Sequence, residues 1–300
     1  MHFFALTATL LLPLASQAID IISSNDDGWA EVNIRSLYSA LTAAGHSVVI
    51  SAPAENESGT GSSTRTPTVL TEACEFDSCP VGSPAYGYNA SQPRFNYVNS
   101  YPATSIQYGI QNLSTKFFDG VPDLAVTGPN VGNNLALTVL FSGTVGAAVS
   151  AVESGIPAIA FSGDTGSQTA WNVSPTPLYS QVYAELATTL TDHLIASGAP
   201  PYLPPDIWLN VNFPAVSNDS CNSADQFSFV LSRIYTAVPL ISGADVETCG
   251  STRLPTETAV VDTAGCYVAV SVGNTDKRDG NATQQAVVLD KLSDLLVCLP

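Results

Sequence analysis

The sequence predicts an α/β fold of three layers, a Rossmann-like α/β/α arrangement around a mostly parallel sheet. Residues 19–23 form an apolar, β-branched run with the length of a buried strand. Residues 32–44 follow with helical periodicity that ends at Gly45, and residues 46–52 form a second strand, so the three segments make a β-α-β unit. Further strand-like runs occur at 121–127, 158–162 and 207–213. Their alternation with helical segments is typical of a parallel sheet with helices on both faces.

The helical segments between these strands are expected from the same periodicity. Residues 102–113 begin a helix directly after Tyr101, and residues 146–153 form a helix of small side chains. Residues 178–197 form the longest amphipathic helix, with apolar side chains in register along one face. We expect these helices to act as the scaffold of the sheet.

The order of elements changes after residue 213. Short strands are expected at 227–231 and 266–272, and a final helix at about 283–296. We therefore predict one domain over residues 19–300, with a core over about 19–213. The extension over about 214–300 is predicted to project from the sheet as a β-hairpin and helix section.

The first 18 residues resemble a cleavable secretory signal peptide. Residues 3–15 form a short apolar run, and Ser16-Gln17-Ala18 fits a cleavage site between small residues. A membrane anchor is the alternative, but Pro13 interrupts the run, which is too short to span a bilayer. The sequence therefore predicts a secreted protein, extracellular or vacuolar, with no membrane association.

Six cysteines and several glycosylation motifs agree with export. The cysteine number is even and the spacings do not resemble a zinc site, so disulfides are expected. Cys74 and Cys79 are close enough to close a small loop, whereas three pairings stay open for Cys221, Cys249, Cys266 and Cys298. The motif Asn-x-Ser/Thr occurs at Asn56, Asn89, Asn112, Asn172, Asn218 and Asn281.

The composition excludes one class of partner. The chain has 9 Lys and Arg against 26 Asp and Glu, a formal net charge of −17 over 300 residues. A field of this sign repels long DNA or RNA. A small anionic substrate remains compatible with it if a bound metal supplies local positive charge.

Two adjacent carboxylates, Asp26 and Asp27, follow the first strand directly. In β-α-β units ligands bind beyond the carboxyl ends of the strands. Paired acids there require a proton or a cation, and carboxylate oxygens suit Mg²⁺, Mn²⁺ or Ca²⁺. The alternative is that Asn25-Asp26-Asp27-Gly28 is only a turn, because all four residues favour turns.

Three further segments are expected at the same edge of the sheet. A polar loop containing Ser58 leaves the second strand, and a Gly/Asn loop with Asn130 and Asn134 leaves the next core strand. Ser142-Gly143-Thr144 then opens a helix, where amides and hydroxyls bind anions. The alternatives are a flexible linker at Ser58 and an ordinary helix cap at Ser142.

These segments resemble the SurE survival-protein family of metal-dependent phosphatases and nucleotidases. The motifs are Ser24-Asn25-Asp26-Asp27-Gly28, Ala52-Pro53 with Ser58-Gly59, Asn130-Val131-Gly132 with Asn134, and Ser142-Gly143-Thr144-Val145. They occur in the family's order over about 19–162 and imply the three-layer SurE fold. The chain departs from the family at Trp29-Ala30-Glu31, where His and Pro are usual, and no His follows Asp276.

The resemblance implies a divalent metal bound by Asp26, Asp27, Ser58 and Asn130. It implies substrate contacts from Asn134, Ser142, Gly143 and Thr144, with Asp26, Asn134 and Ser142 as the catalytic residues. It also implies hydrolysis of nucleoside monophosphates or other small phosphate monoesters, and assembly as a homodimer or homotetramer.

We therefore predict a secreted phosphomonoesterase that uses Mg²⁺ or Mn²⁺, with Ca²⁺ as a further option. A Rossmann-type dehydrogenase would need Gly-x-Gly-x-x-Gly after the first strand, where this chain has Ser-Asn-Asp-Asp-Gly. A catalytically silent secreted protein that binds a metal or another ligand on the same fold stays open. It would use the same ligands as an enzyme.

Overall fold

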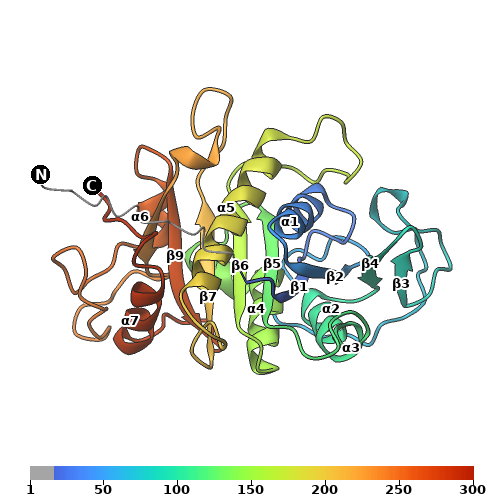
Figure 1. Cartoon of the computed structure of the whole chain (residues 1–300), viewed down its shortest axis with the longest axis horizontal. Helices are drawn as coiled ribbons and strands as arrows, with labels where there is room; N and C mark the ends of the chain where they lie inside the picture. Colours follow the sequence, from blue (N-terminus) through green and yellow to red (C-terminus); the bar gives the residue numbers. More distant parts are fainter. Residues whose placement is uncertain (1–16) are drawn as a thin grey trace, which may run out of the picture.

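The computed structural model describes residues 17–300, and its centre is one sheet of nine strands. The strands are β1 (Asp20–Ser24), β2 (Ser47–Pro53), β3 (Tyr86–Asn89), β4 (Gln92–Val98), β5 (Leu124–Val131), β6 (Ala158–Gly163), β7 (Ile207–Phe213), β8 (Ser228–Ser232) and β9 (Tyr267–Asn274). Their order is β3-β4-β2-β1-β5-β6-β7-β9-β8, and neighbours run parallel except in the pairs β3–β4 and β7–β9 (Figure 1). The mostly parallel sheet is confirmed. The predicted leader over 1–18 lies almost entirely outside the described residues and stays a prediction.

Helices cover both faces of the sheet and complete the three predicted layers (Figure 1). They are α1 (Val32–Ala43), α2 (Pro102–Tyr108), α3 (Ser114–Phe117), α4 (Gly143–Glu153), α5 (Leu178–Ala196), α6 (Glu257–Val261) and α7 (Ala282–Lys291). The helices α1, α5 and α7 share one apolar core, whereas α2 and α4 share another. Successive residues of β1 show the division, because Ile21 packs in the first core and Ile22 in the second.

Two helices differ in detail from the prediction. The helix expected over 102–113 is present as α2, continues as the π-helical stretch η2 (Gly109–Leu113) and ends in α3. The helix expected from residue 146 begins earlier, at Gly143, because the Ser142 hydroxyl accepts a hydrogen bond from the Val145 amide and caps it. The start of α4 packs against β5, because the Thr127 hydroxyl donates to the Thr144 carbonyl at 2.9 Å.

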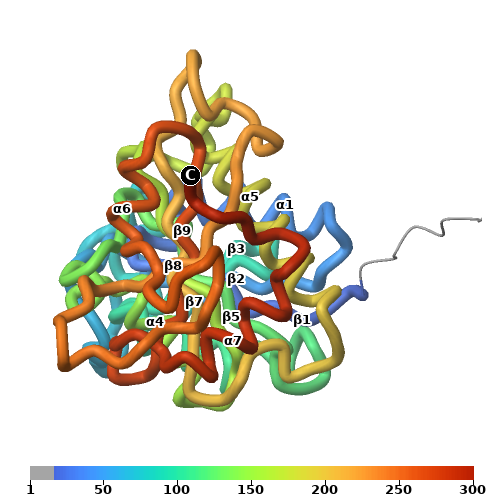
Figure 2. The backbone as a smooth tube through the Cα atoms, turned by 90° about the vertical axis from the view of Figure 1, so that its left-hand side faces the viewer, coloured from blue at the N-terminus to red at the C-terminus, as the bar shows by residue number. Residues whose placement is uncertain are grey.

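The C-terminal section does not project as a β-hairpin and helix, and this part of the prediction is wrong. β8 pairs with β9 in parallel, and β9 pairs with β7 in an antiparallel manner, so both strands belong to the main sheet. Figure 2 shows β8, β9, α6 and α7 together at one end of the molecule. Parallel neighbours need a long crossover, which the segment between β8 and β9 supplies together with α6.

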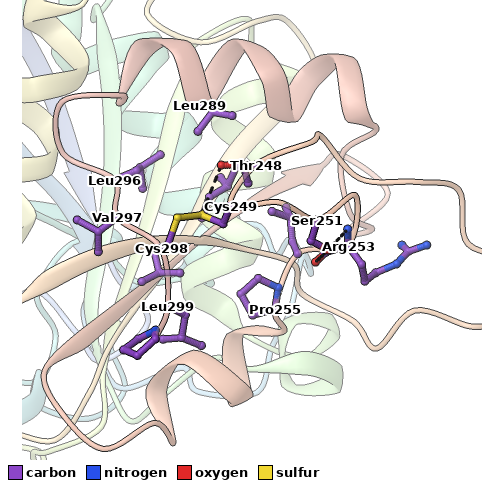
Figure 3. A pocket seen from close by; sticks show the side chains of 14 residues that line it. Thr248, Cys249, Ser251, Arg253, Pro255, Leu289, Leu296, Val297, Cys298 and Leu299 are labelled. Carbon is purple, nitrogen blue, oxygen red and sulfur yellow. Dashed lines mark hydrogen bonds between the residues drawn. A yellow bond between two sulfur atoms is a disulfide. The ribbon is translucent and has the colours of Figure 1, made fainter.

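All six cysteines are paired, which confirms the expected disulfides. Cys74 is bonded to Cys79 as predicted, and the open pairing resolves as Cys221–Cys266 and Cys249–Cys298. The last of these lines an apolar cavity of about 360 Å³ in the C-terminal section (Figure 3). The Cys249–Cys298 bond ties the end of the chain to the loop before α6, so the cavity is bounded by covalently fixed segments.

Candidate active site

The loop after β1 carries two buried acids. The Asn25 carboxamide closes the loop, because its Nδ2 donates to the Gly28 carbonyl (2.9 Å) and its Oδ1 accepts from the Gly28 amide (3.2 Å). Gly28 has a φ of +106°, and a Cβ there would overlap the Glu75 carboxylate, so glycine is required. Asp26 and Asp27 are only 3% and 1% exposed. The segment is a turn, as the alternative reading held, but its acids point into the protein.

The Asp26 carboxylate is bound by the N-terminus of α4. Its Oδ2 accepts from the Gly143 amide at 3.1 Å, and its Oδ1 accepts from the Thr144 hydroxyl. A Cβ at Gly143 would lie 2.8 Å from the Asp26 Cβ, so the approach depends on a residue without a side chain. Burial raises the pKa of Asp26, although these hydrogen bonds favour its charged form.

Asp27 is bound by the end of β5 and by the loop after β6. Its Oδ2 accepts from the Val131 amide at 2.8 Å, and its Oδ1 accepts from the Gln168 carboxamide. Burial, followed by the charge of Asp26, raises the pKa of Asp27 to about 8. The pair is therefore not fully ionised at neutral pH without a counter-charge, which is the condition that favours a bound cation.

Further acids lie close to Asp27 and increase the negative charge. Glu31 is fully buried, and no group among residues 17–300 donates to its Oε1. Burial and the charge of Asp27 raise its pKa well above the usual value. The same two causes, with Glu55, raise the pKa of Glu75 to about 8.

The donor set at this edge suits a hard divalent cation. Asn130 lies at an irregularity in the pairing of β5 with β6, and its Nδ2 donates to the carbonyls of Val131 and Gly132. Within residues 17–300 no side-chain hydrogen bond uses its Oδ1, so that oxygen is available to a ligand. No group of three His, Cys, Asp or Glu side chains suited to a metal occurs in the described part of the chain. A cation here would therefore need amide or hydroxyl oxygens beside Asp26 and Asp27.

Ser58 lies near this edge, but its side chain is directed elsewhere. The Glu57 amide donates to the Asp26 carbonyl at 2.7 Å, which fixes the loop against the first motif. The exposed Ser58 hydroxyl donates to the Asn56 Oδ1 at 2.7 Å. This hydrogen bond uses only the hydroxyl proton, so the lone pairs of the Ser58 oxygen are still available to a cation.

The predicted phosphate-binding residues flank a short 3₁₀ segment, η3 (Ala136–Leu140). Asn134 precedes it, and its Nδ2 donates to the Ser162 hydroxyl while its amide donates to the Asn212 Oδ1. Ser142 follows it as the cap of α4, 5% exposed. Ser142 is thus the N-cap of α4, which confirms the alternative of an ordinary helix cap. The Gly143 amide and the Thr144 hydroxyl both donate to the Asp26 carboxylate.

Three residues near this edge were not predicted from the sequence. Gln168 lies in the loop after β6 and donates to Asp27. This loop leaves the sheet at the edge where the site was predicted, so the position of Gln168 after a strand could have indicated it. The Asn210 Nδ2 donates to the Glu257 Oε1 at 2.6 Å and also to the Asn134 carbonyl, so Glu257 is linked to Asn134 through Asn210. Lys277 donates to the Leu140 carbonyl. The last two come from the C-terminal section, where the sequence pattern carried no such signal.

Comparisons with known proteins show the family to which the chain is similar. The model of the family described as survival protein SurE matches residues 21–234. An acid phosphatase of Yarrowia lipolytica is 33% identical over 292 residues, covering 88% of this chain and 82% of the relative. A 5'-nucleotidase SurE of Lawsonia intracellularis is 29% identical over 199 residues, covering 66% of this chain and 67% of the relative.

A solved structure supports the fold independently. The SurE protein from Aquifex aeolicus superposes with a TM-score of 0.58 at 23% identity, covering 85% of this chain and 93% of that protein. At this identity the likeness concerns the fold alone. The segment matched by the family model contains Asp26, Asn130 and Ser142, although Asn130 lies in β5 and not in the loop predicted for it. With the family match over most of the chain, we conclude that this protein belongs to the survival protein SurE family.

Proposed function

We propose that this protein is a divalent-metal-dependent phosphomonoesterase that hydrolyses nucleoside monophosphates or other small phosphate monoesters. Relatives named acid phosphatase and 5'-nucleotidase, both hydrolases of phosphoric monoester bonds, support the reaction class. One structural observation carries the proposal. The Asp26 carboxylate is bonded to the N-terminus of α4, so the acid pair and the predicted phosphate-binding turn are held together.

The metal would be held by Asp26, Asp27 and Asn130, with the Ser58 hydroxyl oxygen completing the set. These are oxygen ligands, which suit Mg²⁺ or Mn²⁺ and also Ca²⁺. When bound, such an ion lowers the pKa of a coordinated water and compensates charge on phosphoryl oxygens. The fit rests on the paired, buried acids and on the amide oxygen of Asn130 beside them.

The protein's own groups supply the remaining functions. Asp26 orients the attacking water and accepts its proton, because its oxygens retain lone pairs beyond those used by Gly143 and Thr144. The Asn134 carboxamide and the Ser142 hydroxyl face the phosphate from either end of η3. Donors fixed in this way stabilise charge that develops in the transition state.

The test is removal of the cation and of one of its ligands. Chelation should abolish hydrolysis of a model phosphomonoester, and Mn²⁺ or Mg²⁺ should restore it. Asp26→Asn should lower both metal affinity and rate, whereas Asp290→Asn, at an exposed position on α7, should change neither. Full activity in metal-stripped protein, or parent-like activity of Asp26→Asn at saturating Mn²⁺, would contradict the proposal. Metal binding without turnover would identify the silent binding protein instead.

We also propose that the protein is secreted after cleavage near Ile19. Three disulfides support an oxidising compartment, and no helix of the described residues is long and apolar enough to cross a membrane. The same proposal holds that the protein is N-glycosylated and that it assembles as a homodimer or homotetramer. Mass spectrometry of secreted material that finds Met1 would contradict the cleavage.

A further inference from the structure

Lys277 reaches the candidate active site from the C-terminal section. It lies in the loop after β9, outside residues 21–234 that match the family. Its backbone is fixed, because its amide donates to the Asn274 carbonyl at 2.8 Å and its carbonyl accepts from the Tyr235 hydroxyl at 2.8 Å. The side chain extends to the Leu140 carbonyl, which its Nζ contacts at 3.2 Å.

The Lys277 ammonium lies where two segments of the site meet. Leu140 ends η3, two residues before Ser142. The Gly61 amide donates to the Phe141 carbonyl at 2.9 Å, so the loop containing Ser58 packs against this same turn. A Cβ built at Gly61 would be 3.8 Å from the Lys277 Nζ. The ammonium is thus beside both the Ser58 loop and the entry to α4.

This ammonium is buried without an acidic partner. Lys277 is 8% exposed, and within residues 17–300 its Nζ forms no salt bridge with a carboxylate. The protein has 26 Asp and Glu residues and a net charge of −17. None of the acids within residues 17–300 forms an ion pair with Lys277. Burial lowers the pKa of Lys277, with no neighbouring charge to oppose the shift. A buried cation without a counter-charge is costly, and one of its three donors is used by Leu140.

We propose that Lys277 binds the phosphoryl group of the substrate and is a substrate-binding residue of this enzyme. The inference rests on the proposed function and extends it to a residue beyond the family match. The acids around Asp27 repel a phosphate dianion, and Lys277 supplies opposing charge beside the Leu140–Ser142 turn. Its two remaining N–H groups serve as charged donors to phosphate oxygens.

The first test is equilibrium binding of inorganic phosphate to the Mn²⁺-loaded protein by calorimetry. Lys277→Met should weaken phosphate binding about tenfold or more, the loss expected for a hydrogen bond to a charged group. Its Mn²⁺ affinity should match the parent's, and Lys277→Arg should retain part of the phosphate affinity. Lys116→Met is the control, because Lys116 lies over the rings of Tyr88 and Phe117. Parent-like phosphate affinity in Lys277→Met, with or without a lower melting temperature, would overturn the proposal.

A second test uses the unaltered protein. Pyridoxal 5'-phosphate carries a phosphate and an aldehyde, which condenses with a neutral lysine amine and releases water. Borohydride then reduces the imine to a stable secondary amine, and peptide mapping locates it. We expect Lys277 to be labelled and inorganic phosphate to protect it, without protection of Lys116 or Lys291. Unlabelled Lys277, or labelling that phosphate does not reduce, would overturn the inference. Because neither test measures turnover, failure of the phosphatase proposal shows separately, in chelation and Asp26→Asn.

Discussion

Replacement of Glu257 by Gln tests how a buried acid supports the site. Glu257 is fully buried, and its Oε1 accepts from the Asn210 Nδ2 at 2.6 Å while its Oε2 faces the Ala136 amide at 3.4 Å. Burial is the main cause that raises its pKa from the ordinary 4.5 to about 8. The folded protein therefore binds a proton that the unfolded chain releases throughout this pH range.

The sign follows from this difference in bound protons. Stability from Glu257 is fully present below pH 4.5 and is lost as pH rises from 4.5 to about 8. At about 1.4 kcal/mol per pH unit, the loss across that window is about 5 kcal/mol. Glutamine has a similar shape and no titration, so Glu257→Gln should lack this contribution. Relative to the parent, the variant should become more stable as pH rises.

The assay is urea unfolding of parent and variant at pH 4.5 and at pH 8, the ends of this window, with the disulfides intact. Acids such as Asp27 and Glu75 titrate in both proteins, so their effects cancel in the difference. For each pH we take the free energy of unfolding of Glu257→Gln minus that of the parent. We expect this difference to be several kcal/mol larger at pH 8 than at pH 4.5, because only the parent loses stability through the raised pKa of Glu257. An equal difference at both pH values would refute the reasoning.

Four further predictions concern single contacts. Ser142→Ala should lower the free energy of unfolding by about 1 kcal/mol through loss of the α4 cap, and should weaken inorganic phosphate binding while Mn²⁺ affinity persists. Gly146→Ala should lower both melting temperature and activity, because its Cβ would overlap the Gly61 carbonyl oxygen. Arg233→Met should lower the free energy of unfolding in urea by about 3–5 kcal/mol, because the Asp279 carboxylate loses its cation and Asp245 keeps only the more exposed Arg253. Glycopeptide mapping should find Asn56 unglycosylated in active molecules, because a glycan two residues before Ser58 would crowd the substrate's approach to the proposed metal ligand.

The N-terminal half of the fold was predictable because its signals are local. A short window of sequence is enough to predict each element of the first β-α-β unit, namely the strand after Ala18, the helix that ends at Gly45 and the second strand. The right-handed crossover rule then determines how the helix packs against the two parallel strands. Asp26 and Asp27 followed from position, since a strand end in such a unit lies at the binding edge.

The C-terminal section was not predictable in the same way. Its strands β8 and β9 are as apolar as the others, but their partners are set by pairing across long stretches of chain, and β9 runs against β7. A hairpin and a parallel pair with a crossover share the same local pattern. The contacts of Glu257 and Lys277 depend on that arrangement, so no motif in their own neighbourhood indicated them.

The C-terminal section holds η3 at both of its ends, and this segment separates Asn134 from Ser142. At its start the Ala136 amide faces the Glu257 carboxylate, and at its end the Leu140 carbonyl accepts from Lys277. Both contacts come from outside residues 21–234 that match the family. The acid pair, by contrast, is bound by groups within the matched segment and Asn130 lies beside it. The two halves of the predicted site therefore depend on different parts of the chain. The acid pair is held by the family core, and the spacing between Asn134 and Ser142 is set by the C-terminal section.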